Sequence, residues 1–415
     1  MLVLLTDGSG LTARQTATLL SRAGHRVEAL SPDPRCLCRF TRHVRRIHPV
    51  PAYGVDPFDW LDAALDRYAH TGADILLPTQ EQVAVLSCAA DRLAGAGVRT
   101  VVPPFEALAR VQDKVSASAT LDHLGLPQPP FQVIRDDRKL TGWENFPVYL
   151  KLPVGTATSG VRLVTDAHQL RTLPDTWATA AGRGGLLAQQ PVDGPLVMVQ
   201  SVFDHGAMVA HHAAVRTRLG SRGGASHKRS VTMADLTALT EALGRGLRWH
   251  GALSADVILG PAGPVFIDIN PRLVEPVNAA RSGVDLIAPL LDLATGHKPP
   301  RQAAGRPDTA THQLLLAVLG AAQHGGRRPI AGHLARAALG RGEYRASTEE
   351  LTPLRSDPVA ALPVAIAAAT TLIRPATWQR FASSSVDGYA LTREGWQLIR
   401  DRHSALSTNG PTGVV

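Results

Sequence analysis

Residues 266–273 read FIDINPRL, an apolar run in which a polar side chain stands at every second position from Asp268 onward. Successive side chains of a strand point to opposite faces, so Ile267 and Ile269 share one face. The other face carries Asp268, Asn270 and Arg272. We therefore predict a strand with one packed face and one face that either meets water or does chemistry.

The segment SADVILGPAGPVFID, residues 254–268, predicts that this strand is half of a hairpin. GPAG is a turn signal between two apolar runs, and a hairpin centred near Ala262 puts Asp256 directly opposite Asp268. Opposed side chains have Cβ atoms roughly 4.5–5.5 Å apart, so two carboxylates repel each other unless something compensates. A divalent cation such as Mg²⁺ compensates well, whereas a water-facing hairpin with two incidental aspartates is the alternative.

The spacing of Asp256 and then Asp268-x-Asn270-x-Arg272 resembles the metal-binding signature of the ATP-grasp superfamily, in its carboxylate–amine ligase type. Members of this family join a carboxylate to a nucleophile, usually an amine, through an acyl phosphate. The resemblance implies ATP and Mg²⁺ as cofactors, with two ions or Mn²⁺ as variants. It also implies three metal ligands, Asp256, Asp268 and Asn270. Most members carry Glu at both acidic positions, and this chain has the shorter Asp at each.

Residues 111–300 resemble the ATP-binding part of the family over their whole length. The resemblance puts Lys114 and Lys151 on the phosphates and the glycine loop GTATSG around the triphosphate, where backbone amides can bind anions. It puts the segment LLAQQPVDGP beside adenine and ribose. The nucleotide-binding candidates are Lys114, Lys151, Gly155, Thr156, Ser159, Gly160, Gln189, Gln190 and Val192. A plain glycine hairpin is the alternative for the loop.

Two arginines are the candidates for contact with the reacting groups. We expect Arg272 to reach the transferring phosphoryl group, because strand alternation puts it beside the metal ligands and a guanidinium is a good phosphate donor. Arg229 lies in VRTRLGSRGGASHKRSV, which resembles the substrate-facing loop of the family, and we expect it to meet the acyl phosphate. The alternatives are a structural ion pair between Arg272 and Glu275 and an ordinary solvated arginine at 229.

The regions on either side predict a protein of the α/β and α+β classes in three parts. Residues 1–110 alternate strands and helices, which is typical of a Rossmann-like parallel sheet. The ATP-grasp domain follows at 111–300, with a small lobe at about 111–190 and a large lobe at about 191–300. Residues 301–415 are expected to be mostly helical.

Two further patterns concern a possible dinucleotide site and a possible membrane helix. The turn Gly8-Ser9-Gly10, with Glu28 as a ribose-binding acid, leaves a nicotinamide-dependent dehydrogenase as an alternative, although the third glycine of that fingerprint is missing. The apolar run at 359–373 is shorter than the roughly 20 residues that span a membrane, so we expect a buried or dimer-forming helix there.

The composition is that of a globular protein, with 415 residues and 44% hydrophobic content. The net charge of +8 could suggest nucleic acid, but the basic residues are scattered and only 5% of residues are aromatic, so we expect no nucleic-acid partner. Three cysteines cannot build a disulfide framework. The start, MLVLLTDGSG, turns polar after five residues, so we expect no leader and a cytoplasmic enzyme.

Together these patterns predict an ATP-dependent ligase that activates a carboxylate as an acyl phosphate and passes it to an amine, with release of ADP and phosphate. The partners are small carboxylate and amine substrates, in amino-acid, peptide or natural-product biosynthesis. A peptide or carrier protein as acceptor and a homodimer remain open. A nucleotide-binding protein without chemistry is the other alternative, because both acids of the signature are Asp.

Overall fold

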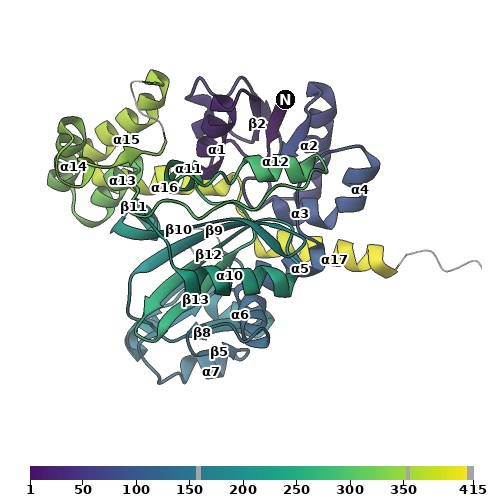
Figure 1. The fold of residues 1–415 in the computed structure, drawn as a ribbon. Helices are drawn as coiled ribbons and strands as arrows, with labels where there is room; N and C mark the ends of the chain where they lie inside the picture. The colour runs from purple at the N-terminus through teal and green to yellow at the C-terminus, as the bar shows by residue number, and fades with distance from the viewer. Residues whose placement is uncertain (156–159, 352–355, 409–415) are drawn as a thin grey trace, which may run out of the picture.

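The computed structural model describes residues 1–155, 160–351 and 356–408 (Figure 1). It contains two four-stranded sheets and one seven-stranded sheet. In the view of Figure 1, the N-terminal sheet and most of the C-terminal helices lie above the seven-stranded sheet, and the second four-stranded sheet lies below it. Any site on the large sheet is therefore reached by segments from both ends of the chain.

The N-terminal sheet is parallel, with strand order β3-β2-β1-β4. Strand β1 (Leu2–Leu5) is buried along its whole length, as its unbroken apolar sequence requires. Helix α2 (Pro57–Thr71) begins with the Asp56 side chain as its cap and ends at Gly72, whose φ of 64° suits glycine. The other elements are β2 (Arg26–Ser31), β3 (Ile47–Pro49), β4 (Ile75–Leu77), α1 (Leu11–Arg22), α3 (Val83–Cys88), α4 (Ala90–Gly95), α5 (Phe105–Gln112) and the 3₁₀ helix η1 (Leu37–Arg39).

The second four-stranded sheet is antiparallel, with order β5-β8-β6-β7. Helix α6 (Lys114–His123) precedes it and contacts both β8 and the edge strand β13 (Gly263–Asn270) of the large sheet. Its N-cap Asp113 accepts from the Ser116 amide, which fixes the helix start and with it the position of Lys114. The other elements are β5 (Phe131–Ile134), β6 (Val148–Lys151), β7 (Val161–Val164), β8 (Leu186–Gln189), α7 (Asp137–Thr141), α8 (Ala167–Arg171) and α9 (Asp175–Arg183).

The large sheet has the order β13-β12-β9-β10-β11-β14-β15 and is antiparallel except for its last pair. The two strands at one side of it, β14 (Ala310–His312) and the edge strand β15 (Thr348–Glu349), come from beyond residue 300. The C-terminal region therefore joins this sheet and is not purely helical. The other elements are β9 (Leu196–Asp204), β10 (Ala207–Leu219), β11 (Ala225–Val231), β12 (Gly251–Gly260), β13 (Gly263–Asn270), η2 (Ser221–Gly223), α10 (Ala234–Leu247), α11 (Val277–Ser282) and α12 (Ala288–Ala294).

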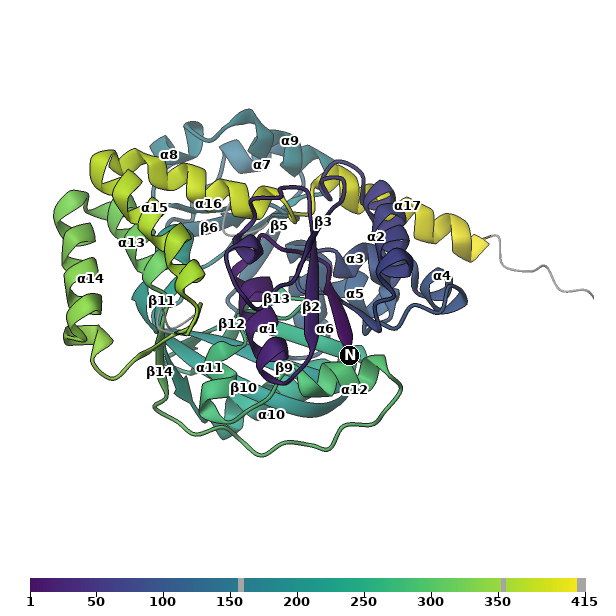
Figure 2. The same ribbon diagram turned by 90° about the horizontal axis from the view of Figure 1, so that it is seen from above.

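The C-terminal helices divide into two groups (Figure 2). Helices α13 to α16 pack together around Val318, Ala322, Ile330 and Ala368. Helix α17 returns instead to the N-terminal region, where its Trp396 packs on Phe105. The bounds are α13 (Leu314–His324), α14 (Arg327–Leu339), α15 (Ala361–Ile373), α16 (Trp378–Asp387), α17 (Arg393–Thr408), η3 (Gly342–Tyr344), η4 (Pro358–Ala360) and η5 (Pro375–Thr377).

A buried ion pair ties the two ends of the chain together. Arg14 of α1 donates to Asp357 at 3.1 Å, and both side chains are almost fully buried. Thr41 also donates to this carboxylate. Within the described residues, no helix combines the length and the apolar character that crossing a membrane requires.

Candidate active site

The hairpin of β12 and β13 pairs Asp256 with Asp268, as the sequence predicts. The turn itself is centred half a residue earlier than expected, because Gly260 pairs with Gly263. A β-bulge at Ile267 then adds one residue to β13 and restores the expected pairing beyond it. Without this bulge, Asp256 would face Ile267 and the two carboxylates would not meet.

The two carboxylates of the hairpin share one cavity with Asn270 and Arg272. Removal from water, and then the facing Asp268, raise the pKa of Asp256 to about 6. The ammonium of Lys114 lies 3.0 and 3.1 Å from the two carboxylate oxygens of Asp268. The start of α6 therefore supplies one positive charge to a site that has an excess of negative charge.

A second lysine reaches the same hairpin from the small antiparallel sheet. Lys151 is buried, and its Nζ donates to Gln189 Oε1 and to the Ile267 carbonyl, both at 2.6 Å. Ile267 is the bulged residue, so the irregularity of the ladder presents this carbonyl to the lysine. Burial lowers the pKa of Lys151 to about 8, which makes its charge responsive to an anionic ligand.

The remaining nucleotide candidates occupy the same lobe. The Leu152 amide donates to the Gly160 carbonyl at 2.8 Å, and a Cβ at Gly160 would come within 3.1 Å of Leu152, so the end of the glycine loop is tightly folded on its start at Gly155. The Gln190 amide is bound to the Pro130 carbonyl, and Val192 lies against Gly260 at the tip of the hairpin. Thr156 and Ser159 lie outside the described residues.

Arg272 is held by a different acid from the one considered in the sequence. Its Nε donates to Glu81 Oε1 at 3.0 Å, and both side chains are about nine-tenths buried. Burial alone lowers the pKa of Arg272, but the Glu81 carboxylate raises it above its usual value. The expected alternative partner, Glu275, is bound instead to Lys228. The ion pair joins the hairpin to the segment that follows β4 of the N-terminal sheet.

Arg229 does not come to this site. Neighbouring side chains on a strand point to opposite faces, and on β11 it is Lys228 that points inward, to Glu275 and Glu350. Arg229 points outward, is 56% exposed, and lies 3.8 Å from the exposed Asp308. Arg229 is not among the residues that line the cavity, so the expected contact with the acyl phosphate stays a prediction that this geometry does not favour.

The buried network around Lys228 could not be predicted from the sequence. Burial lowers the pKa of this lysine, but Glu275 and Glu350 together raise it above its usual value. Gln15 and Gln313 also donate to Glu350. These residues come from five separate segments, so no local spacing could have linked them. Glu275 also lines the cavity, as do Asp256, Asp268 and Asn270. We call the side of the hairpin that carries these last three residues the metal-ligand face, because they are the predicted metal ligands.

In the glycine turn near the N-terminus, the space and the amide groups that a dinucleotide would use are taken by side chains of the protein. Asp7 accepts from the Ser9 and Gly10 amides, and a Cβ at Gly10 would lie 2.3 Å from the Gln80 side chain. Glu28 is bound by His48 at 2.5 Å. These contacts disfavour a dinucleotide at this turn, and they weaken the dehydrogenase alternative.

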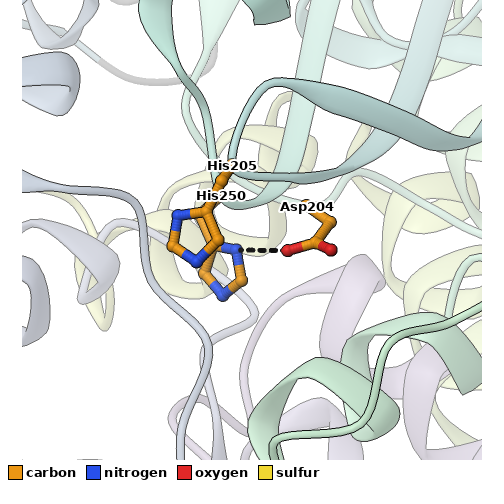
Figure 3. A group of neighbouring side chains, drawn as sticks. All are labelled: Asp204, His205 and His250. Atoms are coloured by element: carbon orange, nitrogen blue, oxygen red, sulfur yellow. Dashed lines mark ion pairs between the residues drawn. The ribbon is translucent and has the colours of Figure 1, made fainter.

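A second group of potential metal ligands lies at the opposite end of β9 from the cavity (Figure 3). His250 Nδ1 is 3.6 Å from Asp204 Oδ1, and its ring stacks on His205 with centroids 4.2 Å apart. Stacked rings present their faces to each other, so their nitrogen lone pairs do not converge on one point. Burial and then the neighbouring His205 lower the pKa of His250. We interpret these three residues as structural, because they pack together at the turn that joins β9 to β10.

The chain is similar to solved structures of two kinds of enzyme, although no protein-family model matches it. One is the biotin carboxylase domain of 2-oxoglutarate carboxylase from Hydrogenobacter thermophilus, solved with MgADP, ADP and bicarbonate, at 18% identity and a TM-score of 0.59 over 74% of this chain and 73% of that chain. Biotin carboxylase from Campylobacter jejuni gives 18% identity and a TM-score of 0.58, over 74% of each chain. An ADP complex of N5-carboxyaminoimidazole ribonucleotide synthetase gives 14% identity and a TM-score of 0.59, over 81% of this chain and 85% of that chain.

Both kinds of enzyme share the ATP-grasp fold. At these identities the likeness concerns the fold, and it confirms the ATP-grasp fold that the hairpin signature predicted. The function of this chain is therefore inferred from the residues that surround its hairpin.

Proposed function

We propose that this chain is an ATP-dependent ligase that activates a carboxylate as an acyl phosphate and transfers the acyl group to an amine. The observation that supports this most is the convergence on one hairpin of Asp256, Asp268, Asn270, Lys114 and Lys151. Two carboxylates, an amide and two ammonium groups from four separate elements are the groups that a metal–triphosphate complex requires. The ATP-grasp fold adds to this proposal, because relatives by fold were solved with ADP or MgADP.

The residues on the hairpin fit a magnesium ion. Asp256 has a raised pKa because it is desolvated beside a second carboxylate, and a hard cation would stabilise both in their charged form. Asp256, Asp268 and Asn270 would hold the ion, and Lys114 would move from Asp268 to a phosphate. When bound, the ion neutralises the charge of the phosphate oxygens and orients them. Mn²⁺ has the same ligand preference and would serve as a substitute.

The nucleotide would lie between the small antiparallel sheet and the hairpin. Lys114, Lys151 and the loop from Gly155 to Gly160 would surround the triphosphate. The segment from Gln189 to Val192 would meet adenine and ribose. Because Gln189 already accepts from Lys151, a change at either end of the nucleotide is expected to affect the other.

The reaction needs little covalent work from the protein. A carboxylate oxygen of the acid attacks the γ-phosphorus, the bond to the β–γ bridging oxygen breaks, and ADP leaves. The amine nitrogen then attacks the acyl carbon, the bond to the phosphate oxygen breaks, and phosphate leaves while the nitrogen loses a proton to solvent. Positioning and charge stabilisation by Lys114, Lys151 and Arg272 carry the catalysis.

Two alternatives share the same nucleotide site. In one, a thiol on a carrier protein replaces the amine as acceptor. In the other, the chain binds nucleotide without chemistry, which the two Asp residues of the signature favour. Division of the chain at about residues 110 and 300, a Rossmann-like first domain and a homodimer are further parts of the proposal.

The test is ADP and phosphate release by the purified protein with MgATP, a panel of carboxylic acids and a panel of amines, with the products identified by mass spectrometry. We expect ADP release that depends on an acid and an adduct that depends on an amine. ATP binding with no acid-dependent ADP release across the panel would favour the protein without chemistry. Absence of MgATP binding would contradict the site itself.

A further inference from the structure

The cavity that contains the metal-ligand face extends into a region that the proposed function does not explain. Its volume is about 530 Å³, and one end is lined by Asp256, Asp268, Asn270 and Arg272. The rest of the lining consists mainly of apolar side chains from both ends of the chain, with Arg222 among them. Six of the apolar side chains define what we call the apolar wall, namely Phe40, Leu316, Leu319, Ile366, Phe381 and Val386.

The apolar wall is built from elements that are far apart in the sequence. Leu316 and Leu319 come from α13, Ile366 from α15, and Phe381 and Val386 from α16. Figures 1 and 2 both show these helices grouped together to one side of the N-terminal sheet. Phe40, just after η1, closes the wall from the N-terminal side.

Several contacts fix the wall in place. A Cβ at Gly320 would lie 2.8 Å from the backbone of Gly220, so α13 lies directly against the loop after β10. Arg222 donates to Ser383 at 2.6 Å and joins that loop to α16. The buried pair of Arg14 and Asp357 fixes the segment before α15 to α1. These three contacts tie the elements that carry the wall to the rest of the fold.

An apolar surface that lines a cavity of this size is typical of a ligand site. Ile366 is 44% exposed although it lies on the cavity side of α15. Ligand sites combine such surfaces with a few polar groups that orient the ligand, and in this cavity those groups include Asp268, Asn270 and Arg272. The group that reacts first with the γ-phosphate must lie beside the metal, and in the proposed reaction that group is the carboxylate of the acid. The rest of the acid then extends along the cavity.

We propose that the acid substrate is a small molecule with a sizeable apolar body, of aromatic or medium-chain aliphatic kind, which packs against the apolar wall while its carboxylate meets the metal. The inference rests on the proposed function for its account of the carboxylate. Specificity for the acid then resides in the C-terminal helices. Acids without an apolar body leave the wall in water and are poor substrates.

A homologous series of acids tests this directly. Acetate, butyrate, hexanoate, octanoate and 4-phenylbutyrate are titrated into the full chain with MgADP present, and binding is measured by calorimetry. Burial of each added methylene is expected to tighten binding by about fourfold until the cavity is filled. Equal affinities across the series would overturn the proposal.

Two variants of α15 provide a matched pair. Ile366→Asp puts a charge into the apolar wall, whereas Leu362, a described residue one turn earlier with 47% exposure, does not line the cavity. We expect Ile366→Asp to weaken octanoate at least about tenfold, because the bound alkyl chain would have to cover a charged group, and to leave MgADP binding unchanged. Leu362→Asp should bind octanoate like the unaltered protein. Equal behaviour of the two variants would overturn the proposal.

Other outcomes separate this inference from the proposed function. Phe381→Ala removes apolar surface without adding charge, so it should weaken octanoate more than acetate even if Ile366→Asp disturbs α15. Tight octanoate binding without ADP release with any amine would contradict the ligase and leave the apolar site standing. ADP release that is as fast with acetate as with octanoate would support the ligase and overturn the apolar acid. Chain-length dependence with alkylamines instead of acids would also overturn it.

Discussion

The metal-ligand end of the cavity comes from a single hairpin, whereas its apolar end is assembled from helices that lie far from one another in the sequence. At the hairpin, Asp256 and Asp268 are twelve positions apart and meet through local strand pairing. At the apolar end, Phe40 and Phe381 meet the same cavity only after the chain has closed on itself. A site formed by a single hairpin is suited to chemistry that many enzymes share. A surface assembled from distant helices is suited to a substrate that is particular to this protein.

The largest expected effect belongs to the hairpin. Asp268→Asn removes a proposed metal ligand, so we expect acid-dependent ADP release to fall by roughly three orders of magnitude or more, as loss of an essential charge contact does. The fold should persist, because loss of the Lys114 pair is partly offset by relief of repulsion on Asp256. Turnover and melting temperature measured side by side check both statements. Asp308→Asn, which changes an exposed carboxylate, is the matched control.

Arg272 tests whether the ion pair across the cavity has a role in chemistry. We expect Arg272→Ala to lower turnover by roughly two to three orders of magnitude with little change in ATP affinity, because the charge it meets develops in the transition state. The variant also leaves Glu81 buried without its cation, so the melting temperature should fall. Normal turnover per folded molecule would mean that Arg272 serves only to join the hairpin to the N-terminal sheet.

The sequence was informative where contacts are local. Strand alternation and a turn signal predict the pairing of Asp256 with Asp268, which is confirmed, even though the turn lies half a residue earlier and a bulge at Ile267 compensates. Bulges leave no strong mark in sequence, so this correction could not be foreseen. Helix and strand positions beside the hairpin follow from the resemblance to a known fold.

The sequence was uninformative where contacts join distant segments. Arg272 pairs with Glu81, 191 residues away, although Glu275 stands three positions from it. Arg14 and Asp357 are 343 residues apart. Periodicity predicts that α13 and α15 exist, but only the folded chain decides which of their side chains line a cavity. The outward direction of Arg229 is a similar case, because one shift of register on β11 would reverse it.

Lys151 makes nucleotide binding at the hairpin sensitive to pH. Its pKa of about 8 in the free protein is low because burial disfavours the charge, and a bound triphosphate favours it. The lysine is therefore charged below pH 8 and must take up a proton to bind ATP above it. We expect the dissociation constant of MgATP to rise by up to about tenfold per pH unit above pH 8. Calorimetry between pH 7 and 9.5, in buffers of different ionisation enthalpy, measures both affinity and proton uptake.

The control for this pH effect is Lys151→Arg. A guanidinium stays charged across this range, so the pH dependence should flatten. Its broad planar fork fits poorly between Gln189 and the Ile267 carbonyl, so turnover should still fall strongly. A pH dependence that is unchanged in the variant would assign the titration to another group.

The smallest expected effect belongs to Arg229, and it tests the direction from which the substrate enters. Lys228 and Arg229 are neighbours on β11, and only Lys228 points toward the cavity side of the sheet. Because Arg229 is mostly exposed and its partner Asp308 is also exposed, we expect Arg229→Ala to change turnover by less than about twofold and stability by less than about 0.5 kcal/mol. Steady-state kinetics with the best acid of the series and thermal unfolding measure the two quantities. A tenfold loss of turnover would mean that the acyl phosphate is approached from the outer face of β11, and the apolar wall would then lie on the wrong side of the sheet to hold the acid.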